Sequence, residues 1–203
     1  MNLTTNSLQE TIDRARSIAI SPARKKILQP LVEYLQMKRE TTSHLHFICT
    51  HNSRRSQLSQ LWAKVASYYY GLDVNCYSGG VEVTNFNHRV ITTILNQGFD
   101  IVEIQEGENP IYKVKILPNE PSLKMFSKLF NDEVNPNHNF AAILTCDNAD
   151  ENCPYIPGAE RRIPILYEDP KKYDNTPLQE EKYAEKSLEI ASEMFWIFSQ
   201  IDQ

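Results

Sequence analysis

Apolar residues recur along the chain with two different spacings, which divide it into predicted helices and predicted strands. A spacing of three or four residues predicts helices over 7–20, 22–39, 56–70, 85–97, 121–131 and 177–200. Short apolar runs bounded by polar residues or glycine predict strands over 45–49, 72–78, 140–146 and 161–167. Two alternating runs around the turn-like EGENP predict a β-hairpin over 100–116. Because strands alternate with helices, we expect an α/β fold: a three-layer sandwich with a central, mostly parallel four-stranded sheet and helices on both faces.

The composition narrows the class of protein. Hydrophobic residues make up 41% and charged residues 23% of the 203 residues, as in ordinary globular proteins. The net charge of -5 disfavours a nucleic-acid partner. No apolar run approaches the roughly 20 residues that span a bilayer, and the start lacks the features of a secretory signal, so we expect no membrane partner. A cytoplasmic, reducing location follows, where the four cysteines are more often free, catalytic or metal-binding than paired in structural disulfides.

Chemically useful side chains follow three of the predicted strands. Cys49, Cys146 and Asp169 each come just after a strand end. Ligands of parallel α/β sheets bind beyond the carboxyl ends of the strands. We therefore expect these three residues to meet at one edge of the sheet.

The loop after the first strand reads CTHNSRRS, residues 49–56. A strand, a short polar loop and a helix start can point backbone N–H groups at an anion, and the helix start adds positive potential. Such a field stabilises a thiolate at Cys49, and the planar fork of Arg55 suits a tetrahedral oxyanion. Ser56 can cap the helix and donate a hydrogen bond to the Cys49 sulfur. The candidate oxyanion-binding residues are Thr50, His51, Asn52, Ser53, Arg54, Arg55 and Ser56. The alternative is a buried structural Cys49 beside a surface Arg55, which the flanking strand and helix disfavour.

Three segments carry a family resemblance. FICTHNSRRSQ (47–57) resembles the phosphate loop of the low-molecular-weight protein tyrosine phosphatase superfamily and is most similar to that of the thioredoxin-coupled arsenate reductases. NCYSGG (75–80) resembles the second strand and its glycine turn, and YEDPKKYD (167–174) resembles the Asp-Pro loop that carries the general acid. The resemblance implies a phosphatase-like α/β domain over 45–203.

Two parts of the chain have no counterpart in this family. Residues 1–44 are expected to form an N-terminal helical extension packed on the domain. Residues 101–138, which include the predicted hairpin, are expected to form an insertion.

A second cysteine pair lies in LTCDNADENCP (144–154), where Cys146 and Cys153 are seven positions apart. The segment closely resembles the redox segment of the arsenate reductases, in which a strand-end cysteine and a second cysteine in a flexible loop act in relay. The polar stretch between the two is accordingly expected to be mobile. Two unrelated thiols are the alternative. No metal site is expected, because two cysteines without further nearby ligands make a poor zinc set.

The resemblance implies an arsenate reductase. Cys49 would attack arsenate held by Arg55, and Asp169 would protonate the leaving oxygen. Cys146 and Cys153 would then carry a disulfide outward to thioredoxin, an external reductant, with no bound cofactor. A phosphatase acting on phosphotyrosine or another phosphate ester through a phosphocysteine needs only the first three residues and stays open. A non-catalytic oxyanion-binding or redox-sensing module is the third possibility.

Three positions depart from the family pattern. His51 stands where the family usually has glycine, and a positive φ there would strain it. Arg54 replaces a second loop cysteine and adds positive charge near the anion. Gln60 stands where the arsenate reductases carry a glutamate implicated in a potassium site, so dependence on a monovalent cation is not implied.

Overall fold

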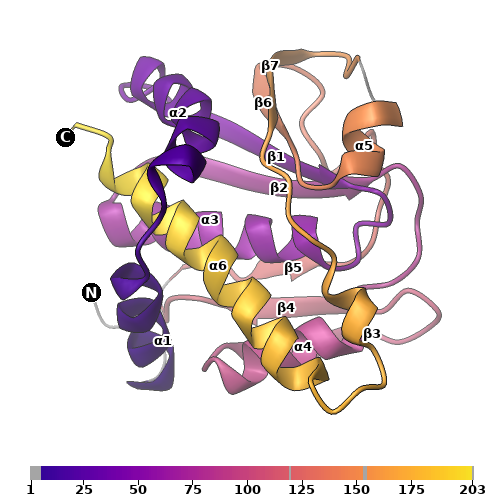
Figure 1. The fold of residues 1–203 in the computed structure, drawn as a ribbon. Helices are drawn as coiled ribbons and strands as arrows, with labels where there is room; N and C mark the ends of the chain where they lie inside the picture. Colours follow the sequence, from indigo (N-terminus) through magenta and orange to yellow (C-terminus); the bar gives the residue numbers. More distant parts are fainter. Residues whose placement is uncertain (1–5, 119, 153–154, 203) are drawn as a thin grey trace.

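Four parallel strands form the central sheet of the computed structural model, which describes residues 6–118, 120–152 and 155–202 (Figure 1). The strand order is β2-β1-β6-β7, and every neighbouring pair is parallel. The strands are β1 (Ser43–Cys49), β2 (Val74–Gly80), β6 (Phe140–Leu144) and β7 (Ala159–Pro164). This confirms the predicted α/β fold with a parallel four-stranded sheet. Strands β1 and β6 lie at its centre, so their carboxyl ends are adjacent.

The helices largely follow the predicted ranges. They are α1 (Asn6–Ser17), α2 (Pro22–Met37), α3 (Arg55–Tyr70), α4 (His88–Asn96), α5 (Asp147–Asn152) and α6 (Gln179–Ser199), with a 3-10 turn η1 (Pro170–Tyr173). Gly71 ends α3 with a φ of 68°, as its place after the apolar pattern predicts. Pro30 lies inside α2 without dividing it.

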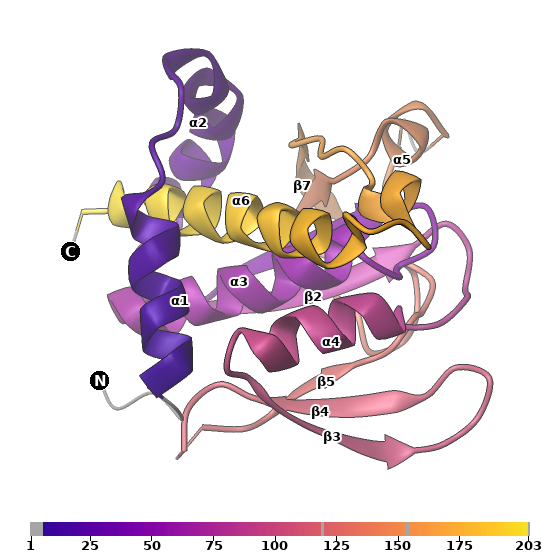
Figure 2. The same ribbon diagram turned by 60° about the horizontal axis from the view of Figure 1, so that its bottom comes forward.

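Helices α3 and α6 cover one face of the sheet, and the two N-terminal helices pack on them (Figures 1 and 2). Leu45 and Phe47 of β1 point into this main core, which also takes in Trp62 of α3 and Phe195 of α6. Helix α2 is further joined to α6 by the ion pair between Arg24 Nε and Glu193 Oε1, at 2.6 Å.

The opposite face of the sheet is covered by shorter pieces. Ile48 and Leu144 belong to a smaller apolar cluster completed by Ala149 of α5, Ile156 and the partly buried Phe130. This layer lies directly behind the carboxyl ends of β1 and β6. It therefore shields the end of the sheet that carries the cysteines.

The region 101–138 contains the main differences from the sequence prediction. The hairpin is confirmed as β3 (Asp100–Gln105) and β4 (Ile111–Lys115), but the helix predicted over 121–131 is wrong. Leu123–Met125 instead forms β5, which pairs antiparallel with β4 and completes a three-stranded sheet beside α4 (Figure 2). Pairing with β4 satisfies this segment's backbone groups and buries Met125, which outweighs a weak helical preference.

Two shorter segments also differ. The polar stretch expected to be mobile forms the helix α5. Gly79 and Gly80 were expected to end the second strand, but they belong to β2. A Cβ at Gly79 would lie 2.4 Å from the Phe130 Cα, and one at Gly80 would lie 2.7 Å from the Asn52 nitrogen. The two glycines therefore let the neighbouring loops approach the sheet.

No helix within the described residues is long and apolar enough to cross a membrane.

His46, at the centre of β1, is fully buried. Burial is the main cause that lowers the pKa of its imidazole to about 3, and the nearby Lys128 ammonium adds to the effect. Below the ordinary pKa of 6.5 the unfolded chain therefore binds a proton that the folded protein does not. The free energy of unfolding must fall as the pH drops from 6.5 toward 3.

Replacing His46 by leucine should remove this loss. We expect His46→Leu to become more stable relative to the parent protein as the pH falls below 6.5. Its unfolding free energy should gain up to about 1.4 kcal/mol on that of the parent per pH unit. Urea denaturation between pH 7 and pH 4 measures it, with the exposed His138→Leu as control. A difference that does not change with pH contradicts the assignment.

Candidate active site

The loop after β1 forms a tight turn around the Cys49 side chain. Cys49 ends the strand and is only 3% exposed, and α3 begins at Arg55. The left-handed residue of the turn is Asn52, with a φ of 46°. Asparagine tolerates this conformation better than most residues. His51 is outside the left-handed region, so the strain that a positive φ would bring is absent at this position.

A directional chain of hydrogen bonds ends at the Cys49 sulfur. The Gln57 side-chain amide, at 3.3 Å, and the Lys128 backbone N–H, at 3.1 Å, both donate to Asn52 Oδ1. This fixes the orientation of the Asn52 amide, so its Nδ2 donates to Ser56 Oγ at 2.8 Å. Ser56 Oγ lies 3.0 Å from Cys49 Sγ. Ser56 accepts from Asn52 on one side, which leaves its own proton available for the Cys49 sulfur.

Arg55 lies at the entrance of α3 with its fork held by the loop after β7. Its Nη1 donates to the Tyr167 carbonyl oxygen at 3.0 Å, and its Nη2 donates to Asp169 Oδ2 at 2.8 Å. Its Nε is buried and has no hydrogen-bond partner within the described residues. A buried, unused guanidinium N–H fits a site that receives an oxyanion. The structure thus brings Arg55 and the predicted acid Asp169 into direct contact.

Cys146 lies beside the same loop. It follows β6, is 1% exposed, and its sulfur accepts a hydrogen bond from the Ala149 backbone at 3.4 Å, in the first turn of α5. Thr50 Oγ1 lies 3.4 Å from the same sulfur. The Thr145 backbone N–H donates to the Ile48 carbonyl oxygen at 2.8 Å, which joins the two strand ends. Two of the three predicted relay cysteines are therefore neighbours, and Cys153 lies outside the described residues.

The other loop side chains are bound to the surrounding scaffold. Ser53 Oγ donates to the Asn85 carbonyl oxygen at 2.7 Å, and His51 Nε2 lies 3.3 Å from the Glu82 carboxylate. These residues are thus left to meet an anion through their backbone N–H groups, which stays a prediction. The Arg54 side chain turns toward α6.

Lys128, which no pattern in the sequence singles out, lies behind the loop, where its backbone N–H contacts Asn52. Its ammonium is buried at 3.5 Å from both Ser78 Oγ and the Phe126 carbonyl oxygen, and 4.6 Å from the centre of the Phe126 ring. Burial is the main cause that lowers its pKa to about 8. Gln60 donates to the Cys76 carbonyl oxygen at 3.0 Å. Because the sequence predicted a helix over 121–131, it did not predict that Lys128 lies behind the loop.

Two further points concern cysteine and metal chemistry. Burial raises the pKa of the Cys76 thiol to about 12, which fits a core residue rather than a reactive thiol. Within the described residues no group of three or more His, Cys, Asp or Glu side chains could hold a metal ion.

Comparisons with known proteins find arsenate reductases among the similar sequences and a low-molecular-weight protein tyrosine phosphatase among the similar structures. No protein-family model matches the chain. It is 29% identical to an arsenate reductase of Bacillus licheniformis over 143 residues, covering 69% of this chain and 81% of the relative. It is 28% identical to an arsenate reductase of Staphylococcus aureus over 155 residues, covering 76% and 97%. A low-molecular-weight protein tyrosine phosphatase from T. tengcongensis matches in structure with a TM-score of 0.51 at 16% identity, covering 78% of this chain and 97% of that one.

Replacing Ser56 by alanine removes the donor aimed at the Cys49 sulfur. A hydrogen bond to a charged group contributes about 1.5–3 kcal/mol, so we expect alkylation of Cys49 by iodoacetamide at neutral pH to slow by about tenfold or more. The rate is followed by mass spectrometry of the Cys49 peptide.

Ser59→Ala is the matched control, because this buried hydroxyl one turn further along α3 donates to the Arg55 carbonyl oxygen instead. Equal alkylation rates in the Ser56 variant and the parent protein would show that Ser56 does not act on the sulfur.

Proposed function

Since the chain resembles the low-molecular-weight protein tyrosine phosphatase superfamily in fold and the arsenate reductases in sequence, we propose that it is a cysteine-dependent oxyanion enzyme that reduces arsenate. The observation that carries the proposal is the grouping of Cys49, Arg55 and Cys146 around one loop. The first has a hydroxyl donor on its sulfur, and the second has an unused buried N–H. The third lies 3.4 Å from the Thr50 hydroxyl.

The first step is nucleophilic attack. The Cys49 thiolate attacks the arsenic atom of arsenate, which Arg55 and the loop N–H groups hold. Asp169 donates a proton to the leaving oxygen, which departs as water. An S–As bond has formed and an As–O bond has broken.

The second step is the reduction. The Cys146 thiolate attacks the Cys49 sulfur, so the S–As bond breaks and its electron pair goes to arsenic. Arsenite leaves, and a Cys49–Cys146 disulfide remains. The Ala149 N–H holds the Cys146 sulfur beside the loop from which this attack would start.

The third step restores Cys49. The Cys153 thiolate attacks Cys146, which frees Cys49 and leaves a Cys146–Cys153 disulfide. An external dithiol, for which we propose thioredoxin, then reduces that disulfide. The cycle requires a reducing compartment, and a cytoplasmic location and a role in arsenic detoxification fit it.

The geometry of α5 places a condition on the third step. The six helical residues Asp147–Asn152 separate the two cysteines and rise about 9 Å along the axis, whereas a disulfide joins Cα atoms about 4.4–6.8 Å apart. We therefore expect helix α5 to bend or unwind when Cys146 and Cys153 pair. Its shortness keeps the cost low, because so short a helix has little stability of its own.

Unwinding of α5 is measurable by amide hydrogen exchange. We expect the backbone amides of residues 147–152 to exchange faster in the Cys146–Cys153 oxidised form than in the reduced form, because the helical hydrogen bonds are lost. The amides of α3 should not change and serve as the internal control. Equal exchange of 147–152 in both forms would rule out this route.

Phosphate-ester hydrolysis is the second candidate function. Phosphate and arsenate share shape and charge, and Asp169 at the Arg55 fork lies beside the place where either oxyanion would bind. Cys49, Arg55 and Asp169 would form a phosphocysteine and pass it to water without help from Cys146 or Cys153.

Cysteine variants separate the two functions. Cys146→Ser and Cys153→Ser should each abolish multiple turnover of arsenate with thioredoxin, thioredoxin reductase and NADPH, because the relay cannot be completed. Any hydrolysis of p-nitrophenyl phosphate should survive both changes, whereas Cys49→Ser should remove both activities. The buried Cys76→Ala is the control. Arsenate turnover at the parent rate in Cys146→Ser would exclude the relay.

A further inference from the structure

Arg54, which takes the place of a loop cysteine, reaches the loop that carries Asp169. Its Nε donates to the Tyr183 hydroxyl at 3.0 Å, and its Nη2 lies 3.6 Å from the Asp174 carboxylate. Tyr183 in turn donates to Asp174 Oδ1 at 2.6 Å. The Arg54 side chain is 11% exposed, so these charges interact in partly desolvated surroundings.

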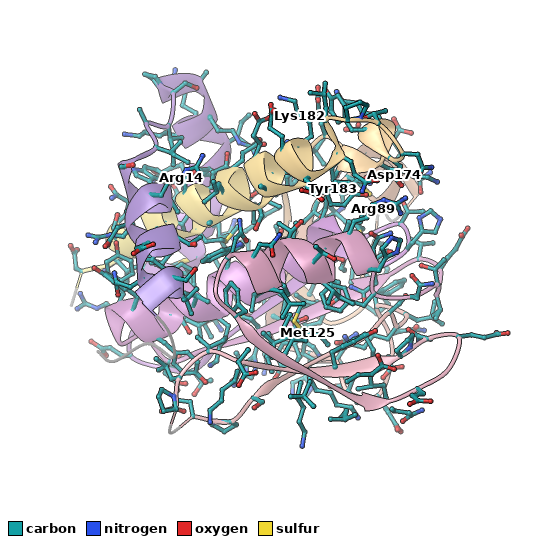
Figure 3. The ribbon with its side chains drawn as sticks, turned by 90° about the horizontal axis from the view of Figure 1, so that it is seen from below. Arg14, Arg89, Met125, Asp174, Lys182 and Tyr183 are labelled. Atoms are coloured by element: carbon teal, nitrogen blue, oxygen red, sulfur yellow. The ribbon has the colours of Figure 1, made fainter. Side chains whose placement is uncertain are left out.

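The same loop is held from its other side. Arg89 of α4 lies 3.6 Å from the Asp174 carboxylate, and donates to Gln179 at 2.6 Å and to Asn175 at 2.9 Å. Arg89, Asp174 and Tyr183 lie together near the first turns of α6 (Figure 3). Residues 169–175 are thus tied to the phosphate loop, to α4 and to α6.

Anion binding sets up a competition for Arg55. In this structure the Arg55 fork holds Asp169, the carboxylate that would act as the acid. An incoming oxyanion needs the same fork, and it repels Asp169 as long as that carboxylate is ionised. Asp169 must leave Arg55 but stay close enough to deliver a proton. Arg54 already lies 4.0 Å from the other Asp169 oxygen.

We propose that Arg54 is a positioning residue: it keeps the Asp169 loop over the phosphate loop when an oxyanion takes Arg55, using Tyr183 and Asp174 as its anchors. The inference rests on the proposed function and refines the prediction that Arg54 binds the oxyanion. If Arg54 bound the anion directly, its substitution would change the affinity for the anion. If Arg54 positions the Asp169 loop, its substitution changes the steps in which Asp169 donates a proton.

Burial is the main cause that raises the pKa of Tyr183 to about 12, and its hydrogen bond to Asp174 adds to it. The phenol therefore stays protonated at neutral pH and keeps donating to Asp174. Arg54 then finds an acceptor in the Tyr183 oxygen, and the anchor does not depend on pH in the working range.

The test compares Arg54→Met with the parent protein, full-length and reduced, with inorganic phosphate as the probe. Calorimetry measures phosphate binding, and hydrogen exchange measures the mobility of residues 168–178 with and without saturating phosphate. We expect phosphate affinity to change by no more than about twofold, and exchange of 168–178 with phosphate to become about tenfold faster in the variant only. For arsenate turnover we expect kcat to fall about tenfold at a nearly constant KM.

Three further variants sharpen the result. Tyr183→Phe removes one anchor and should also speed the exchange of 168–178 and lower kcat, but by less than Arg54→Met does. If Arg54→Met does not fold, Tyr183→Phe takes its place in the test. Arg54→Lys should recover part of the lost kcat. Arg39→Met removes an equal charge from the exposed turn after α2, where Arg39 pairs with Glu40 and not with the loop that carries Asp169, and should change none of the readouts.

Three outcomes overturn the proposal. Unchanged exchange of 168–178 in phosphate-bound Arg54→Met means that Arg54 does not hold the loop. A loss of phosphate affinity of about tenfold or more means that Arg54 is an anion ligand. Absence of phosphate binding by the parent protein would refute the proposed function as well, whereas the first two results refute this inference alone.

Discussion

The hydrogen bond from Ser56 to the Cys49 sulfur is the interaction on which the rest of the site depends. Asn52 donates a hydrogen bond to the Ser56 hydroxyl oxygen, which leaves the Ser56 proton for the sulfur. Asn52 is itself held by Gln57 and by the backbone of Lys128. The glycines of β2 allow this arrangement, since a side chain at Gly80 would collide with the Asn52 backbone. Cys49 belongs to the smaller apolar cluster, and this hydrogen bond gives its buried sulfur a polar partner there.

In the proposed mechanism, two arginines and two aspartates divide the work of binding and protonation. Arg55 holds Asp169, and Arg54 holds Asp174 through direct and Tyr183-mediated contacts. The two adjacent side chains thus have different main partners, although both approach Asp169. Under the proposal, this gives Asp169 a place both before and after an oxyanion binds.

The sequence predicted the parts of this site that are local. Cys49 through Ser56 form one continuous loop, so the expected strand, turn and helix start were readable from spacing alone. The contacts that hold the loop carrying Asp169 are not local: Arg54 and Tyr183 are 129 positions apart, and Arg55 and Asp169 are 114 apart. No sequence pattern within either segment predicts these contacts. Likewise, the segment 121–131 has weak helical spacing, and only its pairing with β4 shows that Leu123–Met125 is a strand. Lys128 was missed with it.

In the proposed mechanism the Cys49 sulfur attacks a bound arsenate, and its bond to arsenic is then replaced by a disulfide bond to Cys146. Mass spectrometry of the Cys153→Ser variant after brief exposure to arsenate, followed by acid quenching, tests this most directly. The account requires a Cys49–Cys146 disulfide that forms with arsenate and not with phosphate, because only arsenate accepts the electron pair. If arsenate leaves Cys49 and Cys146 as free thiols, or if the two pair equally well with phosphate, the account is wrong.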